Sequence, residues 1–225
     1  MKSSSLVLRL TGAAVLAAAA ILPAQDPAGA GAAAGEQVHL EEEYSAPYLE
    51  RAKAEAAAGH WKAAIEIYAF VVGKYPHEVT AVEAGPLNAS RAYVSVLDHV
   101  AARIAAFPPE ALALYRREAD PAAEAQFAAA ASAGDLAGLR RIADLHLLTS
   151  VGDDASDLLA ARLLEAGRAD EAAYYGSRLL RLVPDPSVSR AAVAARLALA
   201  IRRSGRAPEA EEREALTARD RKSVV

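Results

Sequence analysis

Apolar residues recur with helical spacing between residues 48 and 76. They fall three and four positions apart, which places them on one face of a helix. The residues on this face are Trp61, Ala64, Ile65, Tyr68, Val71 and Val72. A preceding helix carries apolar residues every four positions from Tyr48, and Gly59 separates the two helices. Pro76 is expected to end the second helix, because proline cannot continue a helix. The segment predicts an antiparallel pair of helices in which Trp61 is a buried side chain.

Prolines divide the middle of the chain into shorter predicted helices. Gly85-Pro86 is expected to open one, since proline is favourable in the first turn of a helix. Pro108-Pro109 is expected to end that helix and to begin another, which Pro121 should break. The residues expected to face inward are Tyr93, Leu97, Val100, Ile104, Leu112 and Tyr115.

Glycines mark the turns of the second half. Gly134, Gly167 and Gly205 each stand beside helical patterns, and they recur at intervals of about 35 residues. The residues expected to face inward here are Leu136, Leu139, Ile142, Ala143, Leu159, Leu163, Ala172, Tyr175, Leu179, Val183, Leu197, Ala198 and Ile201. A recurring unit of two helices and a tight turn is typical of an α-solenoid.

The turn glycines belong to a wider pattern of small residues, aromatics and prolines. The first unit carries it as Ala52, Gly59, Ala64, Tyr68 and Pro76. The second unit has Ala160, Gly167, Ala172 and Pro184, with Gly176 at the aromatic position. The third unit has Ala198, Gly205 and Ala210, with Glu214 at the aromatic position. This pattern resembles the tetratricopeptide-repeat family.

The resemblance implies an all-α fold, an α-solenoid of antiparallel helical hairpins wound into a right-handed superhelix. Such stacks present a concave surface suited to a peptide or a partner helix. The first-helix sites that would form a basic clamp for a carboxylate hold Leu49, Lys53, Ala56 and Ala57. Since at most one of them is a cation, a receptor for peptide carboxyl termini is disfavoured.

Composition agrees with helices and excludes several classes of protein. Alanine makes up more than a quarter of the 225 residues, the aromatic fraction is 5%, and there is no cysteine. Alanine-rich helices are thin, so their partners must approach closely. The lack of cysteine excludes a disulfide scaffold and a cysteine-ligated metal site. The net charge of −4 gives no electrostatic drive toward nucleic acid or an anionic membrane.

The amino terminus predicts export. Residues 1–24 read as a signal peptide, with Lys2 and Arg9 ahead of an apolar core, and cleavage after Ala30 is the alternative. We expect a disordered linker over 25–40, the helical-repeat domain over 41–220, and a frayed tail over 221–225. The mature protein is expected in the periplasm or secreted, without stable insertion in a membrane.

No residue is predicted to be catalytic, to bind a cofactor or to ligate a metal. The five histidines lack the short spacings of metal sites, and no phosphate loop is present. The order of Asp153, Asp154 and Asp157 does not match a calcium loop, so helix capping is the interpretation. The pair Arg140-Arg141 is not taken as a DNA-binding motif, given the negative net charge and export.

A second resemblance concerns the middle of the chain, from Phe107 to Ser150. It is similar to a helical region of exported bacterial proteins that often continue into a pyrroloquinoline-quinone-type β-propeller. The leading hypothesis is a non-catalytic scaffold of the bacterial cell envelope that binds a protein or peptide. One alternative is an accessory or truncated helical module of such a propeller protein. Another is a small envelope hydrolase that uses unrecognised carboxylates.

Overall fold

The computed structural model describes residues 44–83 and 91–217. Several predicted segments lie outside the described residues: the signal peptide with both cleavage sites, the linker over 25–40, Gly85-Pro86 and the tail over 221–225. The first and last residues of the predicted domain also lie outside them.

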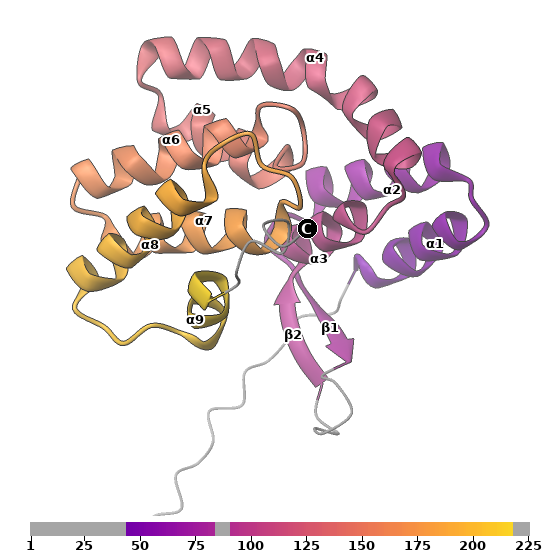
Figure 1. Cartoon of the computed structure of the whole chain (residues 1–225). Helices are drawn as coiled ribbons and strands as arrows, with labels where there is room; N and C mark the ends of the chain where they lie inside the picture. The colour runs from indigo at the N-terminus through magenta and orange to yellow at the C-terminus, as the bar shows by residue number, and fades with distance from the viewer. Residues whose placement is uncertain (1–43, 84–90, 218–225) are drawn as a thin grey trace, which may run out of the picture. The chain divides into compact units, whose positions relative to one another are not determined.

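The described chain is mainly helical, with one small sheet (Figure 1). Its elements in order are α1 (Ala46–Ala57), α2 (Trp61–Lys74), β1 (Val79–Glu83), β2 (Arg91–Ser95), α3 (Val96–Ala105), α4 (Pro109–Ala133), α5 (Leu136–Leu145), α6 (Gly152–Glu165), α7 (Ala169–Leu182), α8 (Arg190–Ser204) and α9 (Ala210–Thr217).

The predicted turn glycines are confirmed as turns between helices. Gly59, Gly134, Gly167 and Gly205 have φ angles of 79°, 65°, 77° and 72°. Only glycine adopts this left-handed conformation without a steric cost, which explains why the helices end there. The helices on either side of Gly59 and of Gly167 fold back on each other, so each glycine joins a packed helical pair.

The first pair buries most of its predicted face, but not its tryptophan. Ala64, Ile65, Tyr68 and Val71 are buried. Trp61 is only half-buried, because it begins α2 at the edge of the pair, where its ring lies 5.1 Å from that of Phe107. The expectation of a buried Trp61 is therefore wrong.

A β-hairpin replaces the start of the helix predicted after Gly85-Pro86. β1 and β2 pair antiparallel, with Thr80 opposite Val94 and Ala81 opposite Tyr93. Both strands are rich in β-branched and aromatic residues, which favour an extended chain. Tyr93 therefore lies in a strand and is 50% exposed, contrary to the prediction. The helix starts only at Val96, where the Ser95 hydroxyl accepts a hydrogen bond from the Leu97 amide at 3.2 Å.

Pro121 does not break the helix that begins at Pro109. α4 continues to Ala133 and is visibly bent in Figure 1. Proline removes one backbone hydrogen bond, but Pro121 and Arg117 are both exposed, so water can reach the carbonyl that is left free. The Asp120 carboxylate also holds the neighbouring loop, since it accepts from the Ser150 amide at 2.9 Å.

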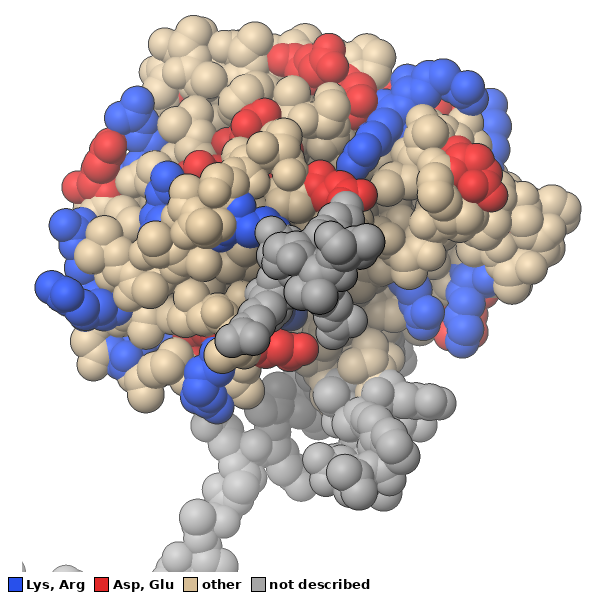
Figure 2. Space-filling model, viewed as in Figure 1, with Lys and Arg blue, Asp and Glu red and all other residues tan. Residues whose placement is uncertain are grey.

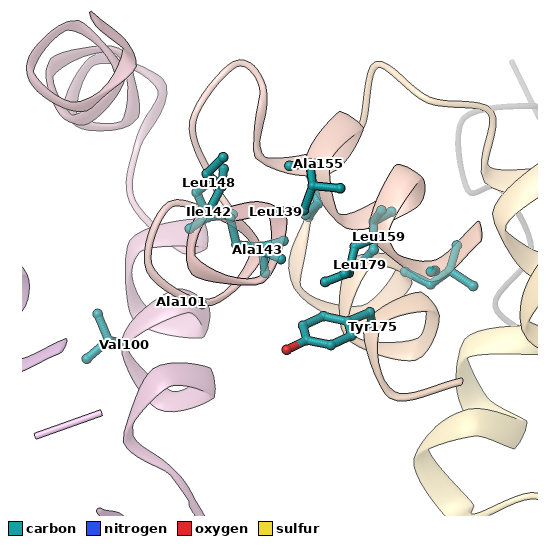
Figure 3. Close-up of a cluster of buried hydrophobic side chains, with 14 of the residues drawn as sticks. Val100, Ala101, Leu139, Ile142, Ala143, Leu148, Ala155, Leu159, Tyr175 and Leu179 are labelled. Atoms are coloured by element: carbon teal, nitrogen blue, oxygen red, sulfur yellow. The ribbon is translucent and has the colours of Figure 1, made fainter. Parts of the chain in front are cut away.

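The core lies where α3 meets α5, α6 and α7 (Figure 3). The side chains labelled there come from these four helices and from the loop after α5, and they are Val100, Ala101, Leu139, Ile142, Ala143, Leu148, Ala155, Leu159, Tyr175 and Leu179. Most predicted inward positions are confirmed as buried, while Leu97, Leu112 and Leu136 are half-buried. Ala198 is exposed, contrary to the prediction, because α8 turns Leu197, Ala200 and Ile201 inward instead.

Close helix packing explains the glycine at the aromatic position of the second unit. A Cβ atom built on Gly176 of α7 would lie 3.5 Å from the Cβ of Leu197 on α8. An aromatic ring would have to push these helices apart. Within the described part of the chain, no helix is both long and apolar enough to cross a bilayer.

Candidate functional site

A cavity of about 440 Å³ lies between α2, α3, α4 and residues 144–148 at the end of α5. Its wall is mostly aliphatic and alanine side chains from the inner faces of the three helices, such as Val72, Val100 and Ala119. Alanine is short, so α4 leaves space between itself and α2 where longer side chains would have filled it. The volume is within the range of roughly 300–1,000 Å³ in which proteins bind small molecules.

Two tyrosines belong to the cavity wall. Tyr68 is 2% exposed and Tyr115 is 8% exposed, and both line the cavity. Burial raises the pKa of Tyr115 to about 12 and also raises the pKa of Tyr68, so both groups stay protonated and can donate.

His146 and Asp144 add polar groups to the same wall. Burial lowers the pKa of His146, which keeps the imidazole neutral. Burial raises the pKa of Asp144, opposed by the Arg178 charge and by the hydrogen bond from the Tyr175 hydroxyl. That hydroxyl donates to Asp144 Oδ1 at 3.2 Å.

Behind Asp144 lies a buried arginine that joins three helices. The side chain of Arg178 on α7 is 1% exposed. Its Nε donates to the Asp98 carboxylate of α3 at 2.5 Å, and one terminal nitrogen donates to the Ala143 carbonyl of α5 at 2.6 Å. It also lies 3.4 Å from Asp144 Oδ1. A charge this deeply buried requires such partners, so the network holds α3, α5 and α7 in one arrangement.

The charged residues that line the cavity are all acidic. They are Glu66 of α2, Glu118 of α4 and Asp144. Glu66 makes a long contact of 4.0 Å with Lys62, and Asp144 is paired with Arg178, while Glu118 has no ion-pair partner in the described chain. No lysine or arginine belongs to the described cavity wall. The cavity wall is therefore mainly apolar, and Glu66 and Glu118 are exposed residues of that wall.

A second surface feature is an aromatic cluster on the first helical pair. The Phe70 ring lies 5.0 Å from the Tyr48 ring and 6.2 Å from the Tyr75 ring, and Phe70 is 43% exposed. The Lys74 ammonium lies 5.3 Å from the centres of both the Phe70 and the Tyr75 rings. Tyr48 and Tyr75 are half-buried, so Phe70 is the exposed ring of the cluster. An exposed aromatic ring beside a cation is typical of the residues that dominate protein interfaces.

Two aspartates near the start of α6, Asp153 and Asp157, bind residues outside their own helix. Asp153 is buried and accepts hydrogen bonds from the Ser187 amide, from the Ser187 hydroxyl at 2.7 Å and from the Val188 amide at 3.3 Å. Asp157 pairs with Arg196 of α8. The predicted role as helix caps is thus replaced by links from α6 to the segment that leads into α8 and to α8 itself.

The positions compared with a carboxylate clamp do not form a basic groove. Leu49 is buried in the core, and Lys53 pairs with Glu50 of its own helix at 3.5 Å. Arg140, of the Arg140-Arg141 pair noted in the sequence, is also occupied, since it pairs with Glu171 of α7 at 2.5 Å. Figure 2 shows basic and acidic side chains in small groups of both signs on one face of the molecule, with uncharged surface between them.

The acidic and histidine side chains of residues 44–83 and 91–217 are not gathered into a metal site. No group of three or more histidine, aspartate or glutamate side chains is arranged there to hold a metal ion. A comparison with protein-family models, curated proteins and solved structures found no match to this chain.

Proposed function

We propose that the protein is a non-catalytic interaction scaffold of the bacterial cell envelope, exported by its amino-terminal segment. In this proposal the helices from α5 to α9 form a tetratricopeptide-like, right-handed solenoid, and the aromatic cluster of the first helical pair contacts a protein partner. The observation that carries the proposal is this cluster, in which an exposed Phe70 lies against the half-buried Tyr48 and Tyr75, with Lys74 above two of the rings.

The repeat part of the proposal is supported by polar links between residues that are 31 to 39 positions apart. Arg140 bonds Glu171, which is 31 positions away. Arg178 and Asp144 are 34 positions apart, and the same separation joins Ser187 to Asp153. Arg206 bonds Asp170, which is 36 positions away. A tetratricopeptide unit is about 34 residues long, so each link joins similar places in successive units.

The aromatic cluster favours a protein partner because large exposed rings are costly to leave in water. Burial of a half-exposed phenylalanine contributes on the order of 1 kcal/mol. The Lys74 ammonium makes a carboxylate on the partner favourable beside the apolar contact. We therefore expect the partner to present an apolar side chain next to an acidic residue.

Crosslinking from the cluster tests the proposal. A photoreactive phenylalanine analogue placed at position 70 should capture a defined envelope protein, and excess unlabelled protein should compete for it. The matched control places the analogue at Leu199 of α8, which is similarly exposed at 41%. Phe70→Ser in the competitor should abolish competition, whereas Leu199→Ser should not. Equal capture from both positions, or none from position 70, would refute the interface.

The alternative, an accessory or truncated module of a propeller protein, predicts a different captured species. In that case the crosslinked partner should be a β-propeller protein rather than another envelope component. Identification of the captured chain by mass spectrometry separates the two proposals.

A further inference from the structure

We propose that two copies of this chain associate through the outer edge of β2, with the two β2 strands antiparallel about a twofold axis at Tyr93. The association joins two separate hairpins into one four-stranded sheet. It goes beyond the scaffold function, because the occupant of this edge is a second copy of the chain rather than another envelope protein. The inference rests on the backbone of the hairpin, on its exposed side chains and on the symmetry of β2.

The hairpin is a sheet of two strands with an unpaired edge on each side. Among the described residues, β1 and β2 pair only with each other, and no backbone group outside the hairpin bonds residues 79–83 or 91–94. The hairpin extends away from the helices in Figure 1. Two strands alone are marginally stable in water, and an unpaired edge is a template for a further strand. The occupant that fits this edge is therefore an extended strand.

The backbone of Tyr93 points to the free edge of β2. The Val96 amide donates to the Glu78 carbonyl at 2.9 Å, so these two residues form a bonded pair at the base of the ladder. Bonded and non-bonded pairs alternate along an antiparallel ladder. Ala81 and Tyr93, three pairs further along, are consequently a non-bonded pair whose amides and carbonyls face away from each other. Tyr93 thus offers one donor and one acceptor to a third strand.

The side chains of the hairpin leave an apolar face open. Tyr93 is 50% exposed and Val79 is 41% exposed, and the register places them on the same face, while Thr80 on the opposite face is buried. Neither a proline nor a bulge interrupts the paired residues of the described strands, and charged residues stand only at the last pair, Glu83 and Arg91. Proteins block edges with prolines, bulges and charges, so this edge is not protected against pairing.

β2 is complementary to a reversed copy of itself. When two β2 strands run antiparallel about Tyr93, the outward amide and carbonyl of one Tyr93 meet those of the other. Arg91 of each copy then lies opposite Ser95 of the other, so no like charges are directly opposite in the ladder. The two exposed Tyr93 rings lie on one face as a cross-strand aromatic pair. β1 has no aromatic residue, so we expect the edge of β2 to pair.

Sedimentation velocity of the full chain at increasing concentration tests this proposal. We expect a monomer that becomes a dimer as the concentration rises, because one pair of short strands buries less surface than a stable dimer does. Tyr93→Pro should weaken the dimer about tenfold or more, since it removes the outward amide and the ring but no bond within the hairpin. Ala81→Pro makes the same backbone change on the edge of β1 and is the matched control, which should leave the dimer unchanged.

Three results of this experiment would overturn the proposal. A chain that stays monomeric at every concentration leaves the edge to a strand of another protein. A dimer that Tyr93→Pro leaves intact has its interface elsewhere. Loss of the dimer in Ala81→Pro alone places the interface on β1.

Crosslinking and a charge variant keep the proposal testable if a proline variant does not fold. The chain has no cysteine, so a single cysteine can be placed on either edge. Tyr93→Cys should join two chains through a short bis-maleimide, whereas Ala81→Cys, directly opposite within the hairpin, should not. Tyr93→Arg should weaken the dimer about tenfold or more, because two like charges then face each other across the axis. Equal crosslinking from the two positions, none from position 93, or an unchanged dimer in Tyr93→Arg contradicts the proposed interface.

Discussion

Replacing Arg178 by methionine tests whether the buried ion network holds the helices together. Methionine keeps an unbranched, apolar stem of similar length, so the change removes mainly the guanidinium. That group is 1% exposed and connects α3, α5 and α7. Its loss leaves Asp144 without this ion-pair partner, while Asp98 keeps Arg181 at 3.5 Å.

The expected cost can be worked out from the contacts. The bond to the Asp98 carboxylate is charge-assisted and contributes about 1.5–3 kcal/mol. The buried Ala143 carbonyl loses its side-chain donor, at a cost of about 1 kcal/mol. The side chains of Asp98 and Asp144 are 18% and 24% exposed, so water can partly solvate them in the variant. We therefore expect Arg178→Met to lower the free energy of unfolding by about 3 kcal/mol, at the lower end for a broken buried pair.

Equilibrium unfolding in urea measures this cost, with Arg162→Met as the matched control. Arg162 is 53% exposed and pairs only with Glu165 of its own helix, so its replacement should cost less than ~0.5 kcal/mol. A double-mutant cycle with Asp98→Asn should give a coupling energy of ~1 kcal/mol or more. A cost below ~1 kcal/mol for Arg178→Met, at an unchanged slope, would refute the structural role of the network.

Three further predictions concern packing and pH. Gly152→Ala should destabilise the protein by more than ~3 kcal/mol in thermal unfolding, because the new Cβ would lie 2.3 Å from the His146 carbonyl oxygen. Gly176→Ala is the control and should be tolerated. Equal stability of the two variants would contradict the close backbone packing around Gly152. Trp61→Ala should cost ~2 kcal/mol rather than the ~3–5 kcal/mol typical of a fully buried ring, because Trp61 is half-buried against Phe107. Burial lowers the pKa of His146, so the unfolded chain binds the proton more readily than the folded chain, and the free energy of unfolding should fall as the pH drops below about 6.5. His146→Gln should make the free energy of unfolding depend less on pH in this range. An unchanged pH profile would show that His146 does not contribute.

The candidate site was only partly accessible to sequence reasoning. Tyr68, Val100, Ile104 and Tyr115 were all predicted to face inward, and each lines the cavity. The cavity was not predicted, because it depends on the distance between helices rather than on which face each helix buries. Arg178 was missed as well, although it stands between Tyr175 and Leu179 on the buried face of α7, which is a signal that could have been followed.

The turns, the helix faces and the helical class follow from local properties of the chain. Gly59 and Gly167 adopt the left-handed conformation at which a helix can end, which other residues adopt only at a steric cost. The spacing of apolar residues marks which face of each helix can be buried. Where local signals conflict, the tertiary structure decides. Pro121 stays inside a helix because its environment is open to water. Residues 79–83 are extended because their backbone groups pair with those of residues 91–95. Likewise the burial of Arg178 and the open space beside Tyr115 exist only once distant helices meet, since both depend on partners that lie far away along the chain.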